Sequence, residues 1–172
     1  LTRGNESVGG GAFSPDGKHF ASVSDDGLLK VWETATAKNI FTFKGHTTGI
    51  NQLAWHPDGN RIFTTSGDNT IKVWDISSPG EINFNASIIG PWNAPVSPDG
   101  KKIVTASFDE TVKVWNVASG ALICVLKDKI DWREDENRFV SLLFRGQTYA
   151  SAQFSPDGEK IITTTVISAV KV

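Results

Sequence analysis

The feature that most constrains the fold of this chain is an internal repeat. Four copies of a Pro-Asp-Gly turn are each followed by a segment rich in β-branched residues, and their prolines are Pro15, Pro57, Pro98 and Pro156. The first three turns recur after 42 and 41 residues, and the fourth follows after 58. A repeat of about 40 residues with several short strands is typical of a β-propeller, in which each repeat forms one blade.

Each copy has the same order of turns and strands. The Pro-Asp-Gly turn leads into a short alternating strand, such as residues 61–66. A second tight turn precedes a strand that ends in Lys-Val-Trp in the first three copies, and a further apolar strand such as residues 39–44 completes the unit. We therefore predict an all-β fold, built from propeller blades of four antiparallel strands.

The repeat also predicts how the chain is divided. We expect blades at about residues 1–44, 45–86, 87–127 and 147–172, with an insertion at 128–146. The fourth copy ends one residue before the position of its tryptophan. Since the chain holds three full copies and an incomplete fourth, we expect these repeats to form an open partial propeller, although the apolar side faces of a blade favour a ring that closes or is capped.

The copies resemble the WD-repeat family. In that family a histidine after glycine, a strand hydroxyl, a turn aspartate and the tryptophan form a buried hydrogen-bonded chain. The resemblance implies such a structural tetrad in the second copy, formed by His46, Thr64, Asp68 and Trp74. Ser66 is an alternative to Thr64, because both lie on the same face of the strand.

The resemblance implies partial tetrads in the first and third copies. Asn5 stands where the first copy would have its histidine, and the third copy has none. The members that remain are Ser22, Asp26 and Trp32 in the first copy, and Thr105, Asp109 and Trp115 in the third. A buried aspartate requires hydrogen-bond donors, so we interpret these sets as structural rather than catalytic.

Composition limits the classes of partner and location. The net charge is −2 with no basic excess, which argues against nucleic acid. No apolar stretch approaches the ~18 residues of a membrane span, so we expect no membrane partner.

Cys124 is the only cysteine, which fits a reducing compartment, and we expect a cytoplasmic protein. The chain begins at Leu1 and contains no methionine, so we expect it to be part of a longer protein.

The sequence predicts no catalytic residue, metal site or cofactor. His19, His56 and Cys124 occupy unrelated turn and strand positions without metal-ligand spacing. Acidic pairs such as Asp25 and Asp26 are interpreted as solvated turns.

The insertion at 128–146 interrupts the repeat. Asp131 and Glu134 form a capping pattern, and apolar residues from Trp132 to Leu143 share one helical face, which favours a helix over about 131–145. The alternative is a strand at 138–144. The insertion would either cover an exposed edge of the propeller or bind a partner.

Three residues are candidates for protein binding. Phe108 lies at the tip of the turn before Asp109, and the resemblance places that turn on the face from which the insertion emerges, near Trp132 and Arg133. Aromatic residues and arginine dominate binding hot spots. The alternative is that Phe108 and Trp132 pack against each other.

Two functions remain open. The resemblance favours a non-catalytic protein–protein interaction scaffold within a larger regulatory or signalling protein. Its partners would be other proteins, together with further blades of a longer chain or a second copy bound through the end blades. The alternative is a propeller enzyme, such as a hydrolase or lactonase-like protein, which would need carboxylates or histidines at the central channel.

Overall fold

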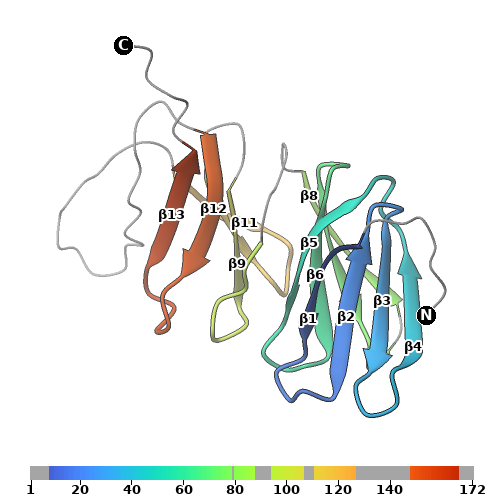
Figure 1. Ribbon diagram of the computed structural model, residues 1–172. Coiled ribbons are helices and arrows are strands. Elements are labelled where there is room, and N and C mark those ends of the chain that lie inside the picture. The colour runs from blue at the N-terminus through green and yellow to red at the C-terminus, as the bar shows by residue number, and fades with distance from the viewer. Residues whose placement is uncertain (1–7, 79, 88–93, 107–110, 127–147, 167–172) are drawn as a thin grey trace.

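The computed structural model describes residues 8–78, 80–87, 94–106, 111–126 and 148–166. All the regular structure in this part of the chain is β-strand (Figure 1). The first sheet contains β1 (Val8–Phe13), β2 (His19–Ser24), β3 (Leu28–Glu33) and β4 (Lys38–Lys44). The second contains β5 (Ile50–Trp55), β6 (Arg61–Ser66), β7 (Thr70–Asp75) and β8 (Gly80–Ser87). The third contains β9 (Lys102–Ala106), β10 (Val112–Asn116) and β11 (Leu122–Leu126), and the fourth contains β12 (Thr148–Phe154) and β13 (Ile161–Val166).

Within each sheet the strands are antiparallel and follow sequence order. The Pro-Asp-Gly turns join the first two strands. In the first of them, the Gly17 N–H donates to the Ser14 carbonyl oxygen at 2.9 Å, and Gly17 has a φ of 70°. The Ser14 hydroxyl donates to Asp16 at 2.7 Å, so the turn aspartate is held by its own loop. Glycine is needed here because side chains with a Cβ rarely adopt this backbone conformation.

Neighbouring sheets pack face to face around separate apolar cores. We call the face that a sheet turns toward the preceding sheet its N-side face, and the face toward the following sheet its C-side face. Between the first two sheets, the C-side residues Ala21, Val23, Leu29 and Val31 meet the N-side residues Ile50, Ile62 and Trp74. The core between the second and third sheets has the same arrangement, with Phe63, Ile71 and Val73 against Ala94, Ile103, Trp115 and Val117. The core between the third and fourth sheets has Val104, Ala106, Val112 and Val114 against Ala152, Phe154 and Ile161.

This series of stacked sheets confirms the predicted all-β, open partial propeller. The short strand predicted at residues 61–66 is β6, and every residue from Ile62 to Ser66 is buried. The reason is that the second sheet lies between two others, so both of its faces are covered.

The third sheet departs from four regular strands. Ahead of β9 the described chain forms an isolated bridge between Val96 and Ile103, and the Val104 N–H donates to the Pro95 carbonyl oxygen at 3.1 Å. Pro95 has no N–H to contribute to a ladder, which explains the poor pairing of this stretch.

Two further segments bear on the sequence analysis. The first strand contains Gly9, Gly10 and Gly11, and its pairing with β2 shifts register between Val8 and Gly10. The insertion at 128–146, with its alternative helix and strand, lies outside the described residues. Among the residues that are described, no helix is long and apolar enough to cross a membrane.

Candidate functional site

The four residues of the implied tetrad lie together in the second sheet. His46 belongs to the connection between β4 and β5, Thr64 to β6, Asp68 to the turn after β6, and Trp74 to β7. The imidazole bonds to the Thr64 hydroxyl through Nε2 at 2.7 Å and to the Asp68 carboxylate through Nδ1 at 2.9 Å. The indole N–H of Trp74 donates to the same hydroxyl at 2.8 Å.

One pattern of donors satisfies this chain. The Thr64 oxygen accepts the indole N–H of Trp74 and donates its own proton to Nε2 of His46. The remaining ring proton of a neutral His46 then sits on Nδ1 and is donated to Asp68. The imidazole is fully buried, so a neutral ring with both nitrogens paired avoids the cost of a buried charge or an unmatched polar atom.

Asp68 joins two loops. Its Oδ2 also accepts the backbone N–H of Thr47 at 2.9 Å, and its Oδ1 accepts the backbone N–H of Thr70 at 3.0 Å and the Thr70 hydroxyl at 2.6 Å. Burial alone would raise the pKa of Asp68, but the hydrogen bonds from Thr70, Thr47 and His46 outweigh it and lower the pKa to about 2. The carboxylate is therefore ionised at neutral pH and acts as a fixed acceptor.

Ser66, the alternative to Thr64, has other partners. Its hydroxyl lies 3.0 Å from that of Thr48 and donates to the Gly49 carbonyl oxygen at 2.8 Å. Within the described contacts, Thr64 is therefore the residue that links His46 to Trp74.

The partial tetrads retain the pairing of tryptophan with hydroxyl. The indole N–H of Trp32 donates to the Ser22 hydroxyl, and that of Trp115 donates to the Thr105 hydroxyl, each at 3.0 Å. Asp26 is exposed and accepts bonds from Ser24 and Leu28 within its own turn. The first sheet thus has a capped turn in the place where the second has a link between loops. Asn5 and Asp109 lie outside the described residues.

The two loops that Asp68 joins belong to a wider surface, which we call the loop face. It consists of the exposed residues where the β2–β3 turn, the β4–β5 connection and the β6–β7 turn meet: Asp25, Asp26, Thr47, Thr48, Gly67 and Asn69. The first turn touches the connection closely, since a Cβ on Gly27 would lie 2.9 Å from the carbonyl oxygens of both His46 and Thr48. The three segments therefore form one continuous, mutually supported edge across two sheets.

The candidate binding residues Phe108, Trp132 and Arg133 lie outside the described residues, so their role stays a prediction. The described histidines other than His46 have structural contacts. His56 Nε2 lies 2.9 Å from the Gly100 carbonyl oxygen and so joins the second sheet to the third, while His19 stacks on Trp55. Across the described residues, no group of three or more histidine, cysteine, aspartate or glutamate side chains is arranged to hold a metal ion.

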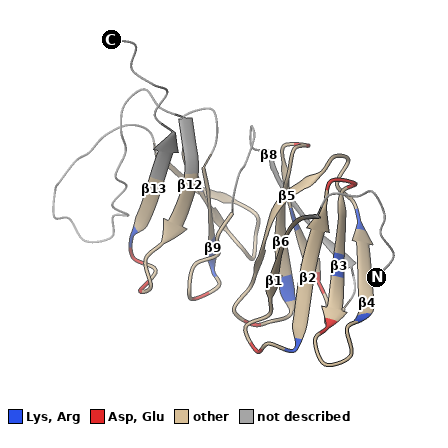
Figure 2. Cartoon of the chain, in the orientation of Figure 1, with Lys and Arg blue, Asp and Glu red and all other residues tan. Residues whose placement is uncertain are grey.

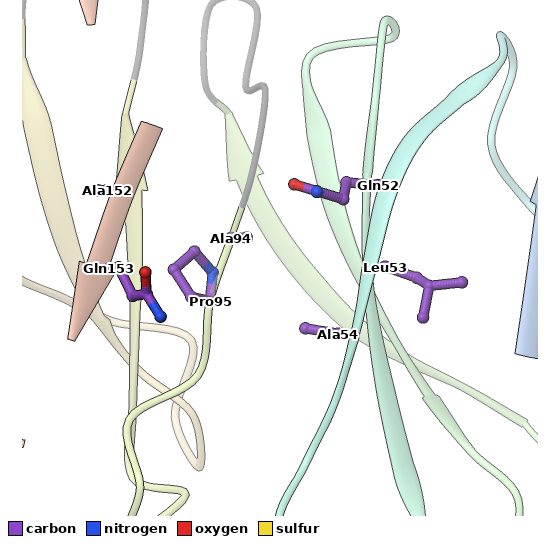
Figure 3. A pocket seen from close by; sticks show the side chains of 7 residues that line it. All are labelled: Gln52, Leu53, Ala54, Ala94, Pro95, Ala152 and Gln153. Carbon is purple, nitrogen blue, oxygen red and sulfur yellow. The ribbon is translucent and has the colours of Figure 1, made fainter. Parts of the chain in front are cut away.

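Sequence reasoning did not find a cavity of about 230 Å³ among the strands that begin the sheets. Figure 3 shows the Gln52 carboxamide directed from β5 toward the stretch with Ala94 and Pro95, whereas Leu53 points away. The cavity is lined by Gln52, Leu53, Ala54, Ala94, Pro95, Ala152 and Gln153. They offer two neutral amides and small apolar walls, with no acid, base or nucleophile. The signal that could have found them is their position on the inner strand of each repeat.

Comparison with known proteins agrees with this geometry. The family described as WD domain, G-beta repeat, matches residues 2–33, 37–75 and 92–116, which is more than half of the chain. The chain belongs to the WD-repeat family. A WD repeat-containing protein of Nostoc sp. (strain PCC 7120) is 50% identical over 40 residues, or 23% of this chain. The match spans 3% of that relative's length.

Membership of the WD-repeat family indicates the kind of role to which the tetrad and the loop face belong. WD repeats generally mediate protein–protein interactions, and WD-repeat proteins are generally non-catalytic scaffolds. In the second WD repeat, the buried Asp68 joins the sheet interior to the exposed connection, through its bonds to His46 and Thr47. The arrangement can hold a surface in a fixed shape without performing a reaction.

Proposed function

We propose that this WD-repeat protein is a non-catalytic scaffold within a larger regulatory or signalling protein, and that the loop face binds a partner protein. The observation that carries this proposal is the hydrogen bond from the Thr47 backbone N–H to the Asp68 carboxylate. It anchors the β4–β5 connection to the β6–β7 turn of the same sheet. A surface that is held in place before binding loses less conformational entropy when a partner arrives.

The chemistry of the loop face favours a protein partner. It presents two aspartates, Asp25 and Asp26, beside the hydroxyls of Thr47 and Thr48, all exposed. This negative surface would repel phosphate groups, and the lysine and arginine positions coloured in Figure 2 are spread over the described sheets. We therefore propose a protein segment with basic or hydrogen-bonding side chains, rather than nucleic acid or a membrane surface.

A charge reversal on the loop face tests the proposal. The 172-residue chain carrying Asp25→Arg is compared in affinity capture with the unchanged chain and with Glu159→Arg, an exposed reversal in the Pro-Asp-Gly turn of the fourth sheet. We expect Asp25→Arg to lose the specific protein partners that the other two retain. If all three capture the same proteins, the loop face is not the binding surface.

We also propose a cytoplasmic location. Cys124 is half-buried, and burial raises the pKa of its thiol, which disfavours the reactive thiolate. A single unreactive thiol is compatible with a reducing compartment. Immunoblotting of cell fractions tests this, and recovery of the protein only from a secreted or membrane fraction would contradict it.

A further inference from the structure

The cavity among the first strands of the second, third and fourth sheets has walls from all three of these consecutive sheets (Figure 3). The repeat explains why space is left there. Ala94 and Ala152 occupy the position of Leu53, four residues before the proline of each Pro-Asp-Gly turn. The Leu53 side chain packs against the apolar core between the first two sheets. The methyl groups of the two alanines are smaller, so the equivalent space in the next two sheets stays open.

Uncharged polar groups lie at this open space. Figure 3 shows the Gln52 carboxamide directed toward Ala94 and Pro95, with Gln153 on the far side of Pro95. Thr65 lies directly opposite Gln52 on the neighbouring strand β6, so both side chains share the face that the second sheet turns toward the third. The Thr65 hydroxyl is buried and has no hydrogen-bond partner among the described contacts. Such an atom is rare in a folded protein and calls for an explanation.

The size and charge of the cavity restrict what it can bind. Its volume of about 230 Å³ is below the roughly 300–1,000 Å³ of sites that enclose a whole small molecule, and fits a single side chain presented by a partner. The lining residues carry no charge, so a charged side chain would lose its hydration without gaining a counter-ion. A purely apolar side chain would cover the carboxamides without pairing them. A neutral polar side chain avoids both costs.

We propose that this cavity binds the carboxamide side chain of a glutamine or asparagine on an exposed segment of a partner protein. A carboxamide has two N–H donors and one carbonyl acceptor, and the side chains of Gln52 and Gln153 offer the matching groups. The aliphatic stem of the bound side chain lies against the methyl groups of Ala54, Ala94 and Ala152. None of the loop-face residues lines this cavity, so the inference does not depend on the proposed function.

A nuclear magnetic resonance titration of the 172-residue chain tests the proposal with three blocked amino acids. The probes are the N-acetyl methylamides of glutamine, glutamate and methionine, which share the same backbone amides and have side chains of similar length. We expect the glutamine probe to shift the side-chain NH₂ signals of Gln52 and Gln153 in a saturable way. It should bind at least tenfold more tightly than either of the other two probes.

Two variants place the binding in the cavity. Gln52→Leu removes an exposed carboxamide and should weaken binding of the glutamine probe at least tenfold. Ala94→Leu introduces the side chain found at position 53 and should abolish the shift of the Gln153 signal by filling the space. Asn60→Leu removes an exposed carboxamide from the Pro-Asp-Gly turn before β6 and is the matched control, which should bind as the unchanged chain does. Melting temperatures establish that each variant is folded, and Gln52→Leu alone decides the matter if Ala94→Leu is not.

Four results would overturn the inference. They are a glutamine probe that gives no saturable shift, a glutamate or methionine probe that binds equally well, Gln52→Leu and Asn60→Leu variants that bind the glutamine probe alike, and a folded Ala94→Leu variant that still binds it.

Discussion

Replacing Asp68 by asparagine removes the charge from the tetrad while keeping the shape of the side chain. One carboxylate oxygen then becomes an NH₂ group. Oδ2 of Asp68 accepts from both His46 Nδ1 and the Thr47 N–H, so a donor placed there would face two other donors. We expect Asp68→Asn to unfold more easily at neutral pH, with the connection before β5 released from the β6–β7 turn.

The size of the effect follows from the pKa of Asp68. Folding lowers it from an ordinary value of 3.8 to about 2. At 1.36 kcal/mol per pKa unit, the folded state holds the ionised carboxylate with about 2 kcal/mol of extra stability. The side chain is 8% exposed, so solvent screening reduces this little. Because the folded pKa is the lower one, this stability is present above about pH 4 and is lost as the pH falls through about 2.

Urea unfolding followed by tryptophan fluorescence measures the free energy of unfolding at each pH. We expect Asp68→Asn to lower it by about 2 kcal/mol at pH 7, and the difference from the unchanged chain to shrink between about pH 4 and pH 2. Asp26→Asn is the matched control, because Asp26 is the exposed equivalent in the first sheet and bonds only within its own turn in the contacts described. Equal losses for the two variants, or a difference that does not change with pH, would refute the reasoning.

Other predictions concern single atoms. Trp74→Phe keeps the buried ring but removes the N–H donated to Thr64, and should lower the free energy of unfolding by about 1 kcal/mol in urea titrations; no loss would mean that this bond is not stabilising. Gly100→Ala should lower the melting temperature more than Gly17→Ala, as read by differential scanning calorimetry. Both glycines have a positive φ, but a Cβ at Gly100 would overlap the His56 imidazole, while one at Gly17 meets nothing within 4 Å. Adding His56→Ser should recover part of the loss, and no recovery would exclude the overlap as its cause.

Local chemistry explains which features could be predicted. The Pro-Asp-Gly turns and the strands ending in tryptophan depend on residues close together in sequence. Thr64 and Trp74 are also near in sequence, and their hydrogen bond crosses neighbouring strands of one hairpin. The period of the repeat therefore indicated both the sheets and their stacking. The same period could not choose between Thr64 and Ser66 as the partner of His46, since both share one strand face.

By itself, the sequence determined the all-β class, the repeated turn and the recurring pair of a hydroxyl and a tryptophan, because each arises within one antiparallel sheet. Only the tertiary structure decided which residues of neighbouring sheets lie against each other. It buried both faces of β6, brought His56 onto the Gly100 carbonyl of the next sheet, and grouped Gln52 with Gln153 around one cavity. The physical reason is that strand periodicity assigns side chains to two faces, whereas contacts between sheets join residues on different repeats, such as His56 and Gly100.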